Sequence, residues 1–482
     1  MLIDRIVVSR IDLVDLFFGR RFNVLSIAFG GSMLRLLSIL VTLTLIIIQT
    51  ASERSTEPTP LAFTRVTLID GRSAEPVPEM TVVVIGGRIA EVGRTGIVTV
   101  PKDARVFDAT GKFLIPGLWD MHVHLSWTTP TALPVLLANG VTGVRDMGGH
   151  LGEIDEWQTK IRGGLLMGPR IVRAGPTLNG QKFNPLQMVA GNPDETRGVI
   201  RALKQVGVDH IKVHRRMLRD SYFAAVEEAK KQQLPLVGHI PMTVRPEEAS
   251  DAGQATIEHT ETLFEGTFTA ALNGRRLADA IRQFRAEAAE KLFARFVKNG
   301  TVVTPTLIAY RSAIDGHDPT LPPDPRQRYV ARSQKRAAQQ RETQVSPEVL
   351  AELKETFAEL REVVRLMNRS GVILITGSDV AVTRVPGFTL HDELVLFVDS
   401  GLTPWEALKA ATLMPAKVVN RAGDLGSIEA GKIADLILLD ANPLADIRNT
   451  QRIRAVIADG KLFDRAALDA LLVEAARAAE SN

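Results

Sequence analysis

The spacing of apolar residues along the chain changes twice. Between residues 61 and 115, short apolar runs follow one another without a helical stretch between them, and Gly86-Gly87 between two of these runs is typical of a hairpin. From residue 118 onward, apolar runs alternate with helical stretches such as 221–233 and 278–299, and after residue 416 the short strands return. The pattern predicts an α/β unit with β-structure on both sides of it.

Eight apolar runs are candidate strands of the central unit. They lie at residues 118–125, 141–148, 170–175, 208–214, 235–240, 256–260, 301–307 and 372–379. Eight strand–helix repeats over roughly 300 residues favour a closed (β/α)8 TIM barrel, which we assign to residues 116–415. We expect residues 61–115 and 416–465, which are similar in pattern, to pair into one small composite β-sandwich domain built from both ends of the chain. Residues 466–482 predict a C-terminal helix.

Residues 311–348 do not fit the rhythm of the barrel, because they are polar, charged and contain Pro. They follow the seventh strand, so they belong to the face on which barrel strands end. An insertion of this kind is either a lid over a site or a solvated pair of loop and helix. The sequence leaves both interpretations open.

The N-terminal region reads as a targeting segment rather than as part of the fold. Residues 36–48 (LLSILVTLTLIII) follow Arg35 and have the length of a signal-peptide h-region, short of the ~20 residues that span a bilayer. We therefore interpret residues 1–52 as an N-terminal extension and signal peptide, with Met33 as an alternative start. The protein is then exported, periplasmic or secreted, and this segment associates transiently with the membrane. An uncleaved anchor or a buried helix is the alternative.

Composition narrows the chemistry. The chain has no Cys, which excludes disulfides, thiolate metal ligands and Cys nucleophiles, so that a metal must be held by His, by carboxylates or by a group derived from Lys. Lys+Arg number 58 against 55 for Asp+Glu, and the basic residues form no long run. This distribution gives no nucleic-acid footprint and points to a small-molecule substrate.

Polar residues with metal-binding side chains stand at the ends of the predicted strands. His122 and His124 are two residues apart at the end of the first strand, so their side chains point to the same side. Further candidates end the fourth, fifth, sixth and eighth strands, namely Lys212, His239, His259 and Asp379. The carboxyl ends of barrel strands converge on one mouth. The sequence therefore predicts a metal centre there.

The segments PGLWDMHVHL, GVTGVRDMGG, VDHIKVH, VGHI, TIEHT, VVTPTL and LITGSDV, with GSIEAGKIADLILLD near the end, resemble the amidohydrolase superfamily, especially its imidazolonepropionase-like and prolidase-like branch. The resemblance runs from about residue 61 to 463. It implies two divalent metal ions, with zinc expected. One would be held by His122, His124 and Asp379, the second by His239 and His259, with Lys212 N-carboxylated and bridging both.

The same resemblance implies attack on a carbon–nitrogen bond by a metal-bridging hydroxide, with Asp379 as general acid and base. A dipeptide or an N-acyl amino acid is the leading substrate. A mononuclear cyclic amide hydrolase, a lactonase or esterase, and a catalytically inactive exported barrel remain as alternatives. A homo-oligomer is compatible with all of them.

The wall of the site departs from the branch pattern, because Lys212 is followed by His214, Arg215 and Arg216 where the family often has small residues. We expect substrate contacts from residues near the strand ends, namely His150, His214, Arg215, Tyr310 and Arg384. His150 and Tyr310 would polarise the substrate, and the arginines would bind a carboxylate. Each of them is also compatible with an ordinary surface role.

Overall fold

The computed structural model describes residues 59–264, 276–339, 345–381 and 384–481. Residues 1–52, for which a signal peptide is predicted, lie outside the described residues. Within the described ranges, no helix combines the length and apolar character needed to cross a membrane. The chain from Pro58 to Asn482 forms one compact unit.

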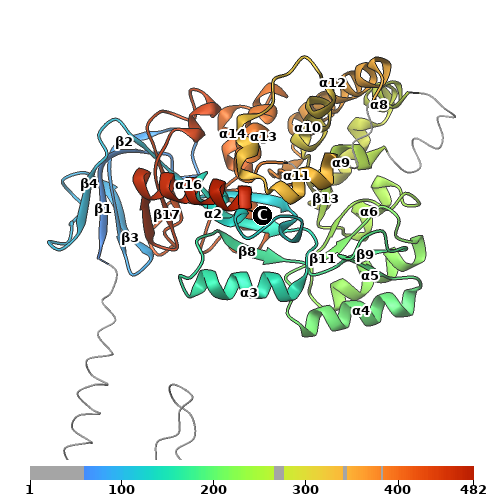
Figure 1. Cartoon of the computed structure of the whole chain (residues 1–482), viewed down its shortest axis with the longest axis horizontal. Coiled ribbons are helices and arrows are strands. Elements are labelled where there is room, and N and C mark those ends of the chain that lie inside the picture. The colour runs from blue at the N-terminus through green and yellow to red at the C-terminus, as the bar shows by residue number, and fades with distance from the viewer. Residues whose placement is uncertain (1–58, 265–275, 340–344, 382–383, 482) are drawn as a thin grey trace, which may run out of the picture. The chain divides into compact units, whose positions relative to one another are not determined.

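The central unit is a barrel of short parallel strands (Figure 1). Three strands pair in the order β6 (Leu118–Val123), β7 (Val141–Asp146) and β8 (Arg170–Arg173). The second set follows the order β10 (Gln187–Val189), β9 (Thr177–Asn179), β11 (Ile211–Val213), β12 (Leu236–Gly238), β13 (Thr256–Glu258), β14 (Val302–Thr304) and β15 (Ile373–Leu374).

Two contacts close the ring between these sets of strands. Met121 N–H of β6 donates to the carbonyl of Thr376, just beyond β15, at 2.9 Å. The eighth strand of the barrel therefore lies beside the first. Asp209 N–H donates to the carbonyl of Arg173 at 2.9 Å and joins β8 to the segment before β11. Strand β9 continues the third strand of the barrel, which β8 begins, and its Leu178 pairs with Val213 of β11. The predicted (β/α)8 barrel is confirmed.

Helices cover the outside of the barrel because one face of each is apolar. In α4 (Pro193–Gln205) the buried residues Ile200 and Leu203 face the core, and the side chain of Asn192 caps the first turn by accepting from two backbone N–H groups. The other outer helices include α2 (Ala132–Ala138), α3 (Leu151–Arg162), α5 (Arg219–Lys231), α6 (Pro246–Ala252), α8 (Leu277–Glu287), α9 (Ala289–Asn299), α12 (Pro347–Arg369), α13 (Phe388–Asp399), α14 (Pro404–Ala410) and α15 (Leu413–Val418).

Both ends of the described chain build the β-domain, which lies at one side of the barrel (Figure 1). The order along its sheet is β18 (Lys461–Asp464), β17 (Ile453–Ala458), β16 (Leu436–Leu439), β5 (Phe113–Pro116), β1 (Leu61–Leu68), β2 (Val77–Ile85) and β3 (Arg88–Arg94), and β4 (Arg105–Asp108) pairs with β1. Side chains from the two halves, such as Phe63 and Leu438, share one buried cluster. The two segments thus join in one composite domain.

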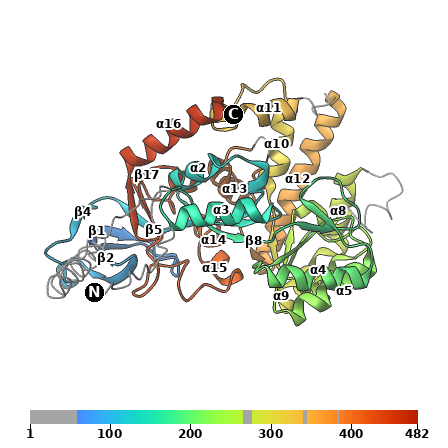
Figure 2. The same ribbon diagram turned by 60° about the horizontal axis from the view of Figure 1, so that its bottom comes forward.

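The described parts of this insertion, residues 311–339 and 345–348, fold into short helices rather than an open loop. They comprise the end of α10 (Leu307–His317), η3 (Pro325–Tyr329), α11 (Arg332–Gln339) and the start of α12. Tyr329 stacks on Phe388 with ring centroids 5.4 Å apart. The C-terminal helix α16 (Arg465–Ser481) packs against η3 and α2. Figure 2 shows α16 passing over α2.

Candidate metal centre

Three neighbouring strands are followed by residues with left-handed backbone conformation. His259 follows β13 with a φ of 67°, and Thr306 and Asp379 have φ values of 48° and 50° beyond β14 and β15. Such a conformation costs a non-glycine residue roughly 1–3 kcal/mol, and it is typically kept where function needs a side chain in an unusual direction. Here it turns His259 and Asp379 toward the mouth of the barrel.

Alternation along β6 brings two further histidines to the same place. Asp120 and His122 of β6 and His124, which directly follows it, occupy every second position, so their side chains share the inner side. The Nε2 atoms of His122 and His124 lie 3.5 and 3.3 Å from Asp379 Oδ1. Asp120 accepts hydrogen bonds from the backbone N–H groups of His122 and Ser378 at 3.3 and 2.9 Å, which ties the end of β6 to the segment that carries Asp379.

The ring of His259 extends the cluster. Its centroid lies 4.6 Å from that of His122 and 4.6 Å from that of His239. The hydroxyl of Thr306 donates to the carbonyl of Pro305 at 2.8 Å, so it can only accept from His259 Nδ1, which lies 2.7 Å away. His259 Nδ1 therefore carries the proton, and Nε2 keeps its lone pair for a metal.

Lys212 lies in the centre of this cluster. Its side chain is fully buried in β11, and the described residues offer Nζ no hydrogen-bond partner. Burial lowers the pKa of Lys212 to about 8, against the opposing charges of Glu258 and Asp379. A neutral amine is thus accessible near physiological pH, and a neutral amine is the form that can react with carbon dioxide.

Asp379 is held as a carboxylate. Burial by itself would raise its pKa, but the charge of Arg384 and the hydrogen bond from His124 hold the pKa well below its ordinary value. Arg384 Nη2 lies 2.7 Å from Asp379 Oδ2. The structure therefore pairs Arg384 with the predicted catalytic residue, so its guanidinium is engaged before any substrate carboxylate arrives.

The donor set fits a divalent metal. One ligand atom each from His122, His259 and Asp379 lie within 4.8 Å of one another. Among the described residues, buried ring nitrogens of His122, His214 and His239 have no hydrogen-bond partner. Burial lowers the pKa of His122 and His239 well below the ordinary value, which favours neutral imidazoles, the form that binds metals. Buried nitrogens without hydrogen-bond partners indicate that these residues are arranged to bind a further group, such as a metal ion.

Two cavities open on either side of the cluster, and His239 lines both. One, of about 160 Å³, is lined by Trp127 and Leu186 together with His124, Lys212 and His214. The other, of about 320 Å³, is lined by residues that include Arg215, Tyr310 and Arg384. Of the predicted substrate contacts, only His150 stands apart, since it is exposed at the start of α3 and lines neither cavity.

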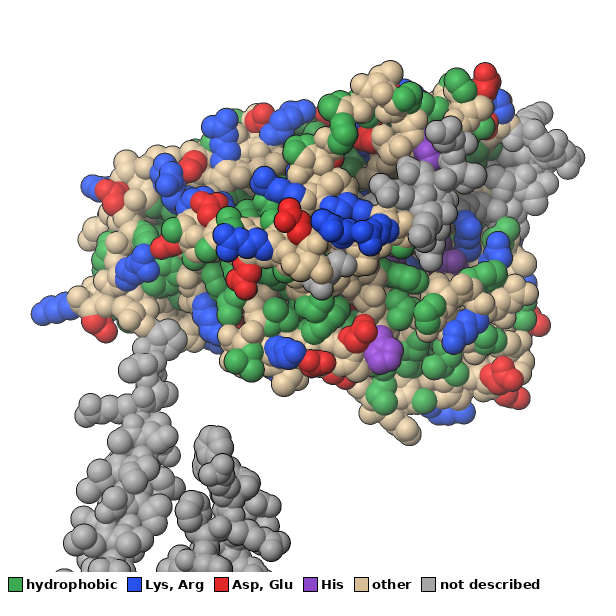
Figure 3. Space-filling model, in the orientation of Figure 1, with side chains coloured by type: hydrophobic (Ala, Val, Ile, Leu, Met, Phe, Trp, Pro, Cys, Tyr) green, Lys and Arg blue, Asp and Glu red, His purple; other side chains and the backbone are tan. Residues whose placement is uncertain are grey.

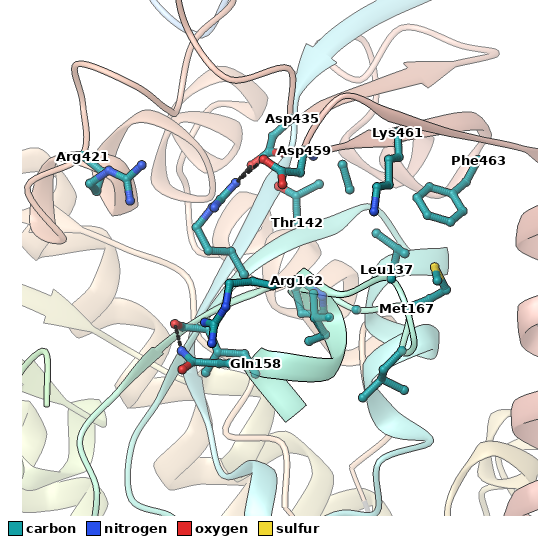
Figure 4. A pocket seen from close by; sticks show the side chains of 18 residues that line it. Leu137, Thr142, Gln158, Arg162, Met167, Arg421, Asp435, Asp459, Lys461 and Phe463 are labelled. Atoms are coloured by element: carbon teal, nitrogen blue, oxygen red, sulfur yellow. Dashed lines mark hydrogen bonds and ion pairs between the residues drawn. The ribbon is translucent and has the colours of Figure 1, made fainter. Parts of the chain in front are cut away.

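A third cavity, of about 260 Å³, lies away from the cluster (Figure 4). It is lined by Thr142 and Arg170 at the amino ends of β7 and β8 and by Asp435, Asp459 and Lys461 of the β-domain. Arg170 spans it with ion pairs to Asp435 and Asp459 at 3.5 and 3.4 Å. The amino-terminal face of a TIM barrel serves stability rather than catalysis, so we assign the chemistry to the opposite mouth.

Charges of both signs are interspersed over the face of the molecule shown in Figure 3. Around the larger cavity, the charged residues Arg215 and Glu261 lie together with the ion pair of Arg384 and Asp379.

The comparisons with known proteins agree with this geometry. The amidohydrolase family matches residues 113–463, and the chain belongs to that family. A putative prolidase from Bifidobacterium longum is 26% identical, with a TM-score of 0.66 over 87% of this chain and 99% of that one. An imidazolonepropionase of Symbiobacterium thermophilum is 23% identical over 411 residues, 76% of this chain and 85% of the relative.

A stretch of 100 residues is 40% identical to the ochratoxinase of Aspergillus niger, but it spans only 20% of either chain. Together these relatives place the chain in the imidazolonepropionase-like and prolidase-like branch, as the sequence predicts. It is a hydrolytic enzyme that acts on carbon–nitrogen bonds.

Some residues of the site were not singled out from the sequence. Arg145, Glu258, Thr306 and Trp127 all contribute to the cluster or its cavities. The first three lie inside the segments VTGVRDMG, TIEHT and VVTPTL, which carry the family resemblance, and of these three Glu258 stands next to a predicted ligand, His259. Trp127 follows the histidine pair by three residues and carries no comparable signal.

Proposed function

We propose that this enzyme is an exported binuclear zinc hydrolase that cleaves the amide bond of dipeptides or N-acyl amino acids. One observation carries the proposal. Four histidines, Asp379 and the buried Lys212, whose Nζ has no hydrogen-bond partner among the described residues, meet between two cavities that share His239. A substrate can thus extend to both sides of the reacting bond.

The metal ligands follow from this cluster. His122, His124 and Asp379 would hold one ion, and His239 and His259 the second. A carboxylated Lys212 would bridge them, which the depressed pKa of its amine supports. Imidazole and carboxylate donors without thiolates suit zinc. The bound ions would act as Lewis acids that polarise a carbonyl and lower the pKa of a water molecule.

Asp379 serves as the proton carrier in this proposal. Its Oδ2 is held by Arg384 at 2.7 Å, while Oδ1 faces His122 of β6 and His124 just beyond it at 3.5 and 3.3 Å. It receives a proton from the attacking water and passes it to the departing amine nitrogen. Arg384 favours the ionised form that accepts the first proton, and its contact with Oδ2 fixes the direction of the carboxyl group during both transfers.

The two cavities suggest how the substrate is oriented. Arg215 and Tyr310 line the larger cavity and suit a carboxylate and a polar group. Trp127 and Leu186 give the smaller cavity an apolar part beside Asn184 and Gln187, and this part suits an apolar acyl or aminoacyl group. The favoured substrate therefore has an apolar group on the carbonyl side and a free carboxylate on the amine side.

A mononuclear cyclic amide hydrolase is the second candidate, and one observation favours it. Among the described residues, His122, His259 and Asp379 are the one group of three whose ligand atoms all lie within 4.8 Å of one another. The number of zinc ions per chain, measured on protein purified in zinc-containing buffer, separates the two. Two ions support the binuclear proposal, and one ion with full activity supports this alternative.

The test of the substrate uses a matched pair of arginine variants. Zinc-loaded protein is assayed against N-acyl amino acids and dipeptides, each with a free or an amide-capped carboxylate. Arg215→Met should raise KM for the free acids about tenfold or more and leave the capped compounds unchanged, since only the former lose a charge-assisted hydrogen bond. Arg216→Met is the control, because the Arg216 guanidinium stacks over the Phe183 ring at 4.4 Å and lines neither cavity. Equal effects on free and capped substrates, or no hydrolysis of either class, would refute the substrate assignment.

A further inference from the structure

A charged network lies inside the barrel directly beneath the metal cluster. The Glu258 side chain is fully buried, and its Oε2 lies 2.8 Å from Nδ1 of His122. Its Oε1 accepts from Arg145 Nη2 at 2.7 Å and from the hydroxyl of Thr256. TIM-barrel interiors are ordinarily filled by branched apolar side chains, and buried charges cost free energy unless their hydrogen bonds are complete. A buried ion pair at this place therefore calls for a function.

The network determines where the proton of His122 resides. A carboxylate can only accept, so Nδ1 of His122 must donate to Glu258. The Nε2 atom of a neutral imidazole then has no proton, and this is the buried atom for which the described residues provide no hydrogen-bond partner. It points toward Asp379 Oδ1 at 3.5 Å. Glu258 thus presents the lone pair of His122 to the cluster.

Arg145 fixes the direction of Glu258. Its Nε donates to the carbonyl of Met121 at 2.7 Å and its Nη1 to Thr256 Oγ1 at 3.0 Å, so that the guanidinium is held in place on three sides. The planar guanidinium group of Arg145 therefore keeps Oε1 of Glu258 facing Arg145 and Oε2 facing His122. We propose that Glu258 is a positioning residue that selects the metal-binding tautomer of His122, and that Arg145 holds Glu258 in the orientation this requires.

The inference rests on the proposed metal centre, but its first readout does not need a metal. In Glu258→Gln one end of the side chain accepts and the other donates. Arg145 can face only the accepting end, so the amide NH2 is directed at Nδ1 of His122. His122 must then accept at Nδ1 and carry its proton on Nε2. Ring-nitrogen NMR of metal-free protein labelled with ¹⁵N-histidine should show this switch of tautomer in the variant.

Metal affinity is the second readout. Competition with a chromophoric chelator should show zinc bound roughly 10–100-fold more weakly by Glu258→Gln than by the original chain, as is typical when the partner of a metal-binding histidine is lost. Adding Arg145→Met to Glu258→Gln removes the donors that dictate the amide orientation, so the carbonyl can turn to His122. The double variant should therefore recover a large part of the lost affinity. A purely structural role of the ion pair would make the double variant worse than the single one.

Thr376→Val is the matched control, since the Thr376 hydroxyl is also buried in the barrel but donates to the carbonyl of Trp119 and not to this network. It should leave the tautomer and the zinc affinity unchanged. The inference is overturned if His122 keeps its tautomer in Glu258→Gln, if the tautomer changes without loss of zinc affinity, or if the double variant gains nothing. Absence of zinc binding by the original chain would refute the proposed function, while the tautomer measurement would still test the role of Glu258.

Discussion

Gly377 offers a sharp test of how tightly the metal centre is built. A Cβ at this position would lie 2.6 Å from Cβ of His122 and 2.7 Å from Cγ2 of Thr304, and 3.1 Å from the backbone nitrogen of His122. Ordinary contacts begin at 3.4 Å, so His122 would have to retreat by about 0.8 Å. Overpacking of this kind costs about 1–3 kcal/mol, and a displacement near 1 Å can lower a rate about 100-fold.

We therefore expect Gly377→Ala to lower kcat/KM by roughly two orders of magnitude and to weaken zinc binding, with a loss of unfolding free energy of about 1–3 kcal/mol. The assays are chelator competition, steady-state kinetics and urea unfolding of the same preparations. Gly198→Ala is the control, because nothing lies within 4 Å of the added methyl in α4 and Ala is favoured there by roughly 0.5–1 kcal/mol. A Gly377→Ala protein with unchanged zinc affinity and rate would show that His122 tolerates displacement, contrary to our reasoning.

Three further outcomes are expected. Lys212→Ala should lose zinc and activity together, and added formate, acetate or propionate should restore part of both. Lys212→Arg should not be rescued by these acids. A normal zinc content in Lys212→Arg would instead indicate that Lys212 acts as a salt-bridge partner. Burial raises the pKa of Glu393 to about 8 although Leu307 and Ile308 N–H groups donate to it. Because this lies above the ordinary value of 4.5, its contribution to stability is complete below pH 4.5 and lost as the pH rises through about 8. Urea unfolding of Glu393→Gln across this range should lack that decline, and parallel curves would contradict the assignment. The mature protein should begin near residues 51–53 and be recovered outside the cytoplasm, and a cytoplasmic product that retains residues 36–48 by N-terminal sequencing would exclude export.

The barrel and most of its polar centre could be predicted because they depend on local periodicity. Every second residue of a strand faces the same side, so the pair of His122 and His124 was recognisable from spacing alone. Strand ends of a parallel barrel share one mouth, which placed Lys212, His239 and Asp379 near that pair without any knowledge of the connections. Both rules act over a few residues, and the sequence displays them directly.

The partnership of Glu258 with His122 could not be derived in this way. Glu258 and His259 are neighbours, and in a regular strand only one of two neighbours faces the interior. The left-handed φ of 67° at His259 breaks the alternation, so that both side chains reach the centre. Such a conformation depends on surrounding tertiary contacts, including the one between His259 and Thr306, and leaves no trace in apolar spacing. The walls formed by Trp127 and Arg215 likewise depend on how separate loops pack.

The pairing of β5 with β16 has a consequence for how the chain folds. Leu114 of β5 lies opposite Leu438 of β16. Strand β5 is synthesised early, but the strand that pairs with this edge follows about 320 residues later in the chain. At ~5–20 residues per second this interval is roughly 15–65 s. During that time one side of β5 has no partner strand, and an unpaired apolar edge is a template for association between chains. Completion of the β-domain is therefore a late, non-local event, and we expect yield to depend on how β5 is protected until residues 436–439 arrive.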